Sequence, residues 1–304
     1  MTDNPLLPSW RDGSTRDALL AFLDAAMALP VAQRVAAFDN DGTLWCERPT
    51  FVQYDFLADA LAAAAAVDPS LAERAEFAAV LADDSAAISD LGLARVAVAL
   101  NGLFAGIEPD EFTARAAEFM HRATHRSLGI PLMAAVYQPM LELLDELRRR
   151  EFTIFIVSGG GTEFVRAISQ ELYGVPPESV VGTLIAYQFV RRDDGRPALL
   201  RTEQIGSAAN EGAAKVSHIQ AHLGRRPILA AGNSAGDREM MEWTCAGDGP
   251  CLALLVGHDD AEREFAYAST AATFDEAEPI AAVAQRLGWT VVSMAHDWAT
   301  VFPS

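Results

Sequence analysis

The chain has 304 residues, 51% of them hydrophobic, which is enough to bury a large core and excludes an intrinsically disordered protein. Its formal net charge of −19 argues against nucleic acids and anionic membranes as binding partners, because both attract basic surfaces. The sequence has no apolar run long enough to predict a membrane span and no basic start typical of a secretory signal.

Three cysteines, Cys46, Cys245 and Cys251, show no spacing typical of a disulfide framework. We therefore expect reduced thiols in a cytoplasmic protein, since disulfides are rare in that compartment. A bridge between Cys245 and Cys251 is the alternative.

The first part of the chain combines one short strand with a long helical region. Residues 14–29 predict a helix, with Ser14 or Thr15 as its N-cap, and residues 34–38 predict a buried strand. From 49 to 137 the sequence is rich in alanine and follows helical periodicity, with breaks that divide it into about four helices.

The remainder alternates β-rich apolar runs with helical stretches. We expect helices at 139–150 and 162–173, and strands at 152–157, 179–183, 227–231 and 251–256. Asp194-Gly195 predicts a hairpin within 185–202, Asp259 and Glu262 predict a helix over 261–268, and residues 291–294 predict an edge strand. This alternation predicts an α/β fold with a Rossmann-like, doubly wound parallel sheet.

Two acidic residues directly follow the first predicted strand, in the segment Asp39-Asn40-Asp41-Gly42-Thr43. Open α/β sheets bind their ligands at this edge, beyond the carboxyl ends of the strands. Two carboxylates this close repel one another, and a divalent cation with oxygen ligands offsets the repulsion. The spacing also allows one carboxylate to act as a nucleophile and the other to transfer protons. A turn or helix cap built from Asp and Gly is the simpler alternative.

Three later segments contain residues that suit the same phosphate and metal chemistry. Ser158-Gly159-Gly160-Gly161 ends the second apolar run, where a hydroxyl and closely approaching backbone N–H groups suit phosphoryl oxygens. Lys215, in a helical stretch, is the single lysine of the chain and supplies a compact point charge. The third apolar run ends in Gly232-Asn233-Ser234-Ala235-Gly236-Asp237.

Over residues 31–260, the order of these motifs resembles that of the haloacid dehalogenase (HAD) superfamily of phosphatases. Within the superfamily, the motifs are most similar to those of phosphoserine-phosphatase-like members. The resemblance implies a HAD-like core formed by residues 1–48 and 138–304, in which 1–30 is a helical N-terminal extension. It implies a helical cap domain at 49–137. The implied activity is Mg²⁺-dependent hydrolysis of a small-molecule phosphate ester through an aspartyl-phosphate.

The resemblance and the chemistry together assign roles to individual residues. The predicted catalytic residues are Asp39 as nucleophile, Asp41 as proton donor and acceptor, Ser158, and Lys215 as the charge between nucleophile and phosphate. The predicted metal ligands are Asp39, the backbone carbonyl of Asp41, Asn233 and Asp237. The predicted substrate-binding residues are Asn40, Gly159, Gly160 and Glu47, with a hinge hydrogen bond as the alternative role of Glu47.

Asn233 stands where the family pattern leads us to expect an aspartate. An amide oxygen still ligates Mg²⁺ but adds no charge, so metal affinity or preference is expected to change. With Asn233 as the ligand, Asp237 orients the waters of the metal or Lys215. Ser234 as the ligand is the competing assignment.

Other functions stay open. A phosphotransferase or mutase would pass the phosphoryl group from the same phosphoenzyme to an alcohol, and Asn233 motivates a non-catalytic interaction module of the same fold. A haloacid dehalogenase is disfavoured, because that chemistry does not need Asp41. The pairs His121/His125 and His218/His222 have a spacing that can bind zinc, but we expect packed or solvated histidines because no third ligand stands near either pair.

Overall fold

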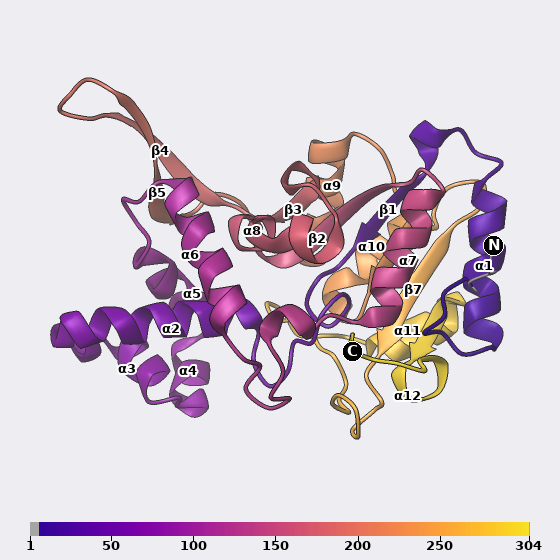
Figure 1. Ribbon diagram of the computed structural model, residues 1–304, viewed down its shortest axis with the longest axis horizontal. Coiled ribbons are helices and arrows are strands. Elements are labelled where there is room, and N and C mark those ends of the chain that lie inside the picture. Colours follow the sequence, from indigo (N-terminus) through magenta and orange to yellow (C-terminus); the bar gives the residue numbers. More distant parts are fainter. Residues whose placement is uncertain (1–5, 304) are drawn as a thin grey trace.

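A six-stranded parallel sheet forms the centre of the computed structural model, which describes residues 6–303 (Figure 1). Its strands are β1 Val35–Phe38, β2 Thr153–Gly161, β3 Val180–Thr183, β6 Leu229–Gly232, β7 Leu252–Gly257 and β8 Thr290–Ser293. The spatial order is β3-β2-β1-β6-β7-β8, and every neighbouring pair is parallel. The strand order therefore reverses between β1 and β6, which confirms the predicted doubly wound α/β fold.

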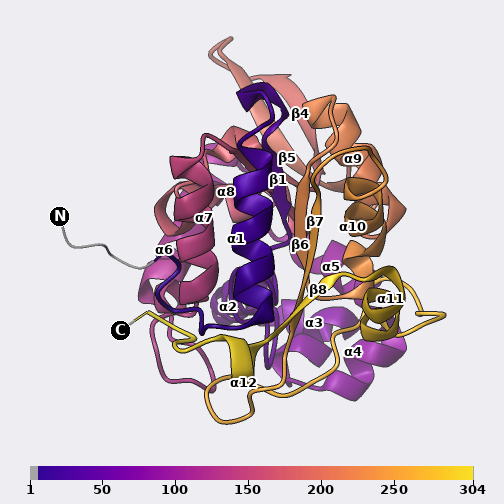
Figure 2. The ribbon, with the colours of Figure 1, turned by 90° about the vertical axis from the view of Figure 1, so that its right-hand side faces the viewer.

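Helices cover both faces of the sheet, as Figure 2 shows. Ala36 and Phe38 of β1 belong to a hydrophobic cluster with one helical layer, and Ala37 belongs to a second cluster with the other. The first layer is α1 Ser14–Ala26, α7 Gln138–Arg149 and α8 Thr162–Tyr173. The second is α9 Ala213–Leu223, α10 Arg238–Thr244 and α11 Ile280–Leu287. Burial on both faces explains why the central strands are continuously apolar.

Residues 49–137, between β1 and α7, are largely helical, as predicted, and their helices lie together to the left of the sheet in Figure 1. The α-helices of this segment are α2 Val52–Val67, α3 Ala75–Leu81, α4 Ser85–Leu91, α5 Leu93–Gly102 and α6 Pro109–Arg122. Gly92, with φ +86°, separates α4 from α5, because an ordinary helix does not continue through that conformation. Treating this segment as a separate cap domain stays a prediction.

The predicted hairpin consists of β4 Ile185–Arg191 and β5 Pro197–Ile205, which pair antiparallel. Its second strand contacts the connection between α5 and α6: Arg201 N donates to Ile107 O at 2.9 Å, and Gly106 N donates to Arg201 O at 2.8 Å. The buried Arg201 side chain donates to Glu163 of α8 at 2.7 Å and lies 3.7 Å from the ring centroid of Phe112 in α6. The hairpin therefore joins the inserted helices to the core.

Two local predictions are wrong. Residues 261–268 form a turn and an isolated bridge between Asp259 and Ala266 instead of a helix, and the Glu264 side chain turns inward to Cys46 and Tyr137. Gly13, not Ser14 or Thr15, precedes the first residue of α1, and the Thr15 hydroxyl donates to Asp297 at 3.0 Å. The last helix of the described residues is α12 Met294–Asp297, which directly follows the predicted edge strand, β8.

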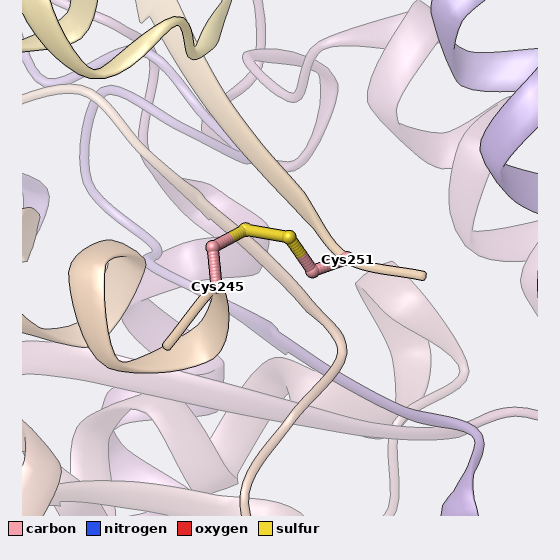
Figure 3. The surroundings of a disulfide bond; sticks show 2 residues. All are labelled: Cys245 and Cys251. Carbon is pink, nitrogen blue, oxygen red and sulfur yellow. A yellow bond between two sulfur atoms is a disulfide. The ribbon is translucent and has the colours of Figure 1, made fainter. Parts of the chain in front are cut away.

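The prediction that all three thiols are reduced is also wrong, because Cys245 and Cys251 form a disulfide (Figure 3). Their Cα atoms lie 5.3 Å apart, at the two ends of the short connection between α10 and β7. The approach of these two elements brings the sulfurs together, and that approach is not visible in the spacing of the cysteines. Cys46 is free and buried.

Three of the four paired histidines contact other protein groups or lie outside the expected helix. His218 Nδ1 lies 2.8 Å from Asn210 Oδ1, His222 Nε2 lies 2.7 Å from Glu178 O, and His125 falls outside α6. Across residues 6–303, none of the helices combines the length and apolar character that crossing a membrane requires.

We expect Arg201→Ala to lower the free energy of unfolding by about 3–5 kcal/mol, because it leaves the buried Glu163 carboxylate without its partner. Arg192→Ala is the matched control, since Arg192 pairs with Glu108 at the exposed surface, where ion pairs contribute little. Urea unfolding followed by circular dichroism measures both variants. Equal losses would contradict the role given to the buried pair.

Candidate active site

Residues from separate segments meet beyond the carboxyl ends of β1, β2 and β6. Asp39 and Asp41 follow β1, Ser158 lies near the end of β2, Asn233 and Asp237 follow β6, and Lys215 comes from the first turn of α9. A cavity of about 560 Å³ opens at this edge. Of the predicted site residues, Asp39, Asp41, Glu47, Gly159, Gly160, Lys215 and Asn233 line it directly.

Lys215 holds two carboxylates together. Its Nζ donates to Asp39 Oδ1 at 2.6 Å, to Asp237 Oδ1 at 2.6 Å and to Val157 O at 2.7 Å, which uses all three ammonium hydrogens. Burial lowers the pKa of Lys215, but the charges of Asp237 and Asp39 outweigh it and raise that pKa above its ordinary range. The ammonium group is therefore charged at neutral pH, and it connects the loop after β1 to the loop after β6.

Both oxygens of Asp237 are in use. Oδ1 accepts from Lys215, while Oδ2 accepts from Asn233 N at 3.0 Å and from Ser234 N at 3.1 Å. The contacts of Asp237 show that it holds Lys215, which is one of its predicted roles. Metal ligation by Asp237 stays a prediction.

Opposing electrostatic effects act on the carboxyl group of Asp39. Burial and the neighbouring Asp237 carboxylate raise its pKa, and the ion pair with Lys215 opposes that rise. Its Oδ2 accepts only a long hydrogen bond, 3.5 Å from the Thr43 hydroxyl. This oxygen has most of its accepting capacity unused, as a nucleophile or a metal ligand requires, and Asp39 lines the cavity.

Asp41 lies between the first two loops. Its Oδ1 accepts from Trp45 Nε1 at 2.9 Å, and its Oδ2 accepts from the Ser158 hydroxyl at 3.3 Å. Burial raises the pKa of Asp41, and the hydrogen bond from Trp45 limits the rise. A carboxyl group with a raised pKa suits proton transfer in both directions.

Asn233 and Glu47 form a buried pair. Asn233 Nδ2 donates to Glu47 Oε1 and to Ser269 Oγ, both at 3.1 Å, and Tyr267 donates to the same Glu47 oxygen at 2.9 Å. The amide nitrogen is thus occupied, which leaves Oδ1 as the free end of the Asn233 amide. Gly42 makes this approach possible: its φ is +71°, and a Cβ there would lie 2.0 Å from Asn233 Nδ2.

The donor set fits a hard divalent cation. Asp39, Asp41, Glu47 and Asp237 bring four carboxyl groups to one region, and Lys215 is the one cation that contacts them there among residues 6–303. Oxygen ligands of the kind Mg²⁺ prefers are the Asp39 carboxylate, the Asp41 backbone carbonyl and the Asn233 amide. Within the same described range, no group of three His, Cys, Asp or Glu side chains is arranged to hold a metal ion. Amide and backbone oxygens would have to complete the coordination.

Sequence reasoning missed several residues that support the site. Tyr173 donates to Asn40 Oδ1 at 3.0 Å, Asn210 Nδ2 donates to Ser158 O at 2.9 Å, and Gln53 Oε1 accepts from Gly161 N at 2.8 Å. These side chains come from elements that only the folded chain brings to the site, so no local pattern marks them. Asn40 is fully buried and its side chain contacts Tyr173, so substrate binding by Asn40 stays a prediction.

Comparisons with known proteins show which family and which folds the chain resembles. The family model of haloacid dehalogenase-like hydrolases matches residues 36–242. A protein of unknown function from Bordetella pertussis Tohama I has a similar fold, with a TM-score of 0.54 and 18% identity over 86% of this chain and 99% of its own. A HAD family hydrolase from Salmonella enterica serovar Typhi gives a TM-score of 0.42 and 16% identity, over 88% of this chain and 69% of that one. A search of curated proteins found no match.

We expect Lys215→Met to lower the free energy of unfolding by about 3–5 kcal/mol, because Asp39 and Asp237 then stay buried without their cation. Adding Asp39→Asn and Asp237→Asn to the same variant should recover part of the loss, since it removes the two unpaired charges. Denaturant titrations of the single and triple variants measure this coupling. If the triple variant is the less stable of the two, the three groups do not form the charge-coupled unit described here.

Proposed function

Since the chain belongs to the haloacid dehalogenase-like hydrolase family, we propose that it is a Mg²⁺-dependent phosphomonoester hydrolase that works through an aspartyl-phosphate on Asp39. The observation that carries the proposal is the contact of Lys215 with both Asp39 and Asp237, in the cavity that Asp41 also lines. This arrangement combines a nucleophile, a fixed positive charge and a proton-transfer group within one enclosed site.

In the first step, a carboxylate oxygen of Asp39 attacks the phosphorus atom as the bond to the leaving oxygen breaks. Asp41 donates a proton to that leaving oxygen, which departs as an alcohol. In the second step, Asp41 takes a proton from water, the water oxygen bonds to phosphorus, and the bond to Asp39 breaks to release phosphate. The raised pKa of Asp41 supports this double role, because the group must be protonated in one step and ionised in the other.

The charge of the phosphoryl group requires compensation by the surrounding residues. Lys215 would supply a fixed positive charge next to Asp39. The loop Ser158–Gly160 would supply the Ser158 hydroxyl, which in the structure donates to Asp41, and backbone N–H groups, of which that of Gly160 donates to Ser158 Oγ. Mg²⁺, held by Asp39, the carbonyl of Asp41 and Asn233, would neutralise phosphoryl oxygens and hold the phosphoryl group in line for attack. Asp237 would act by keeping Lys215 and the Asn233 loop in place.

We also predict a cytoplasmic location for the protein, but one observation expected in its favour, the reduction of all three thiols, is not found. Reduced thiols are typical of the cytoplasm, whereas Cys245 and Cys251 are bonded in the structure. Location therefore stays a prediction that the candidate chemistry does not depend on.

The proposal predicts Mg²⁺-dependent release of phosphate from p-nitrophenyl phosphate, lost with excess EDTA and restored by added Mg²⁺. Asp39→Asn should reduce kcat by about 10⁴-fold or more, because an amide is not a competent nucleophile. Asp68→Asn, on the exposed surface of the inserted segment, is the control and should keep full activity. Undiminished turnover by Asp39→Asn would exclude the aspartyl-phosphate. Formation of a new phosphate ester with glycerol, in place of free phosphate, would favour the phosphotransferase.

We further expect Asn233→Asp to tighten Mg²⁺ binding at least about tenfold, because a carboxylate in place of the amide adds charge to the cation site. The metal-free variant should lose stability, since the new carboxylate lies against Glu47 at about the present 3.1 Å separation. The double variant with Glu47→Gln removes that repulsion and should regain stability without metal. Calorimetric titration with Mg²⁺ and thermal unfolding measure the two effects, and an unchanged Mg²⁺ affinity would place position 233 outside the metal site.

A further inference from the structure

The cavity at the candidate active site has an apolar wall opposite the catalytic loops. Helix α5 contributes Leu93, Ala94, Ala97 and Val98, whose spacing of three and four residues places them on one face of the helix. Helix α2 adds Tyr54 and Leu57, and the base of the hairpin adds Ile185 and Ile205. The substrate's phosphoryl end would thus meet charged loops, while its leaving group would meet hydrocarbon.

The charges that line the cavity are nearly all negative. Asp39, Asp41, Glu47 and Glu211 line it, and Lys215 is the one Lys or Arg that does so in the described part of the chain. The three donors of Lys215 already bind protein oxygens. Glu211 lies near the glycine loop and accepts from Thr273 N at 2.9 Å. A second anionic group on a substrate would therefore find no free cation in the cavity and would face carboxylates instead.

Apolar side chains at the edge of the cavity are unusually exposed. Phe51 is 41%, Leu93 44%, Val98 40% and Ile205 39% exposed, although each lines the cavity. Covering such surface with a hydrocarbon group is favourable, at about 25 cal/mol per Å² of apolar area. A cavity of about 560 Å³ has room for a phosphoryl group together with a sizeable organic group.

We propose that the substrates are phosphate monoesters whose leaving group is an apolar alkyl or aryl alcohol with no further negative charge. The inference rests on the proposed phosphatase function and specifies its substrate class. It excludes nucleoside di- and triphosphates, sugar bisphosphates and phosphorylated carboxylic acids as good substrates, because each brings an additional anion into a cavity without a free cation. The apolar wall supplies affinity, and the acidic lining supplies discrimination.

The first experiment measures kcat/KM with Mg²⁺ for n-alkyl phosphates from ethyl to hexyl. The pKa of the leaving alcohol changes little along this series, so differences report contacts with the wall. We expect kcat/KM to rise by about fourfold for each added methylene until the chain reaches the mouth of the cavity. Replacing the terminal methyl group of the longest ester by a carboxylate should lower kcat/KM at least about tenfold. A flat series, or equal rates for the carboxylate-bearing ester, would overturn the inference.

A charge placed on the wall should reverse the preference. Ala97→Arg puts a cation on the cavity face of α5, so the ratio of kcat/KM for the carboxylate-bearing ester to that for the alkyl ester should rise at least about tenfold. Ala62→Arg, on the exposed side of α2 and outside the cavity, is the matched control and should leave the ratio unchanged. Leu93→Arg at the exposed edge tests the same effect if Ala97→Arg does not fold. An unchanged ratio in a folded cavity variant would contradict the inference.

A binding measurement separates this inference from the phosphatase proposal. Methylphosphonate and hexylphosphonate are titrated calorimetrically into the Mg²⁺-loaded protein, because these compounds cannot be hydrolysed. Tighter binding of hexylphosphonate supports the apolar wall even if no ester is turned over, and equal binding overturns it. Turnover of phosphate esters without a preference for apolar groups would leave the phosphatase intact and reject the substrate class alone.

Discussion

The structure of the site depends on one buried ammonium group. Lys215 Nζ donates to Asp39 and Asp237, each at 2.6 Å, and so connects the loop after β1 to the loop after β6. These strands are neighbours at the point where the strand order reverses, so the ion pair spans the crevice in which open α/β sheets bind ligands. A single lysine in an acidic chain thereby positions the proposed nucleophile and sets the charge around it.

The single positive charge of Lys215 does not neutralise the negative charge of the carboxyl groups around it. Burial raises the pKa values of Asp39, Asp41 and Glu47, which shows that the folded chain disfavours their ionised forms. A bound divalent cation would offset the negative charge of these carboxylates. A bound phosphoryl group would in turn offset the positive charge of the cation and of Lys215. The contact between Asn233 and Glu47 fits the same balance: a neutral amide at 233 is compatible with a carboxylate 3.1 Å away.

The sequence was sufficient to predict which strand ends meet at the edge of the sheet where the candidate site lies. Apolar runs that stop at Asp39, Ser158 and Gly232 mark the carboxyl edge of the sheet, and parallel pairing then brings their loops together. The helical segment at 49–137 was predictable from periodicity. Gln53, Tyr173 and Asn210 were not, because they reach the site through tertiary packing alone. For the same reason, the approach that joins Cys245 to Cys251 and the inward turn of Glu264 escaped the sequence patterns.

The central claim is that the phosphoryl group is transferred to Asp39 next to Lys215. Its most direct measurement is mass spectrometry of the protein quenched in acid during turnover of a phosphate ester with Mg²⁺. The account predicts a phosphoryl mass increase on the peptide that contains Asp39, localised to that residue and lost on incubation at neutral pH. A phosphoryl group on any other residue, or turnover in which no phosphoprotein forms, would contradict it.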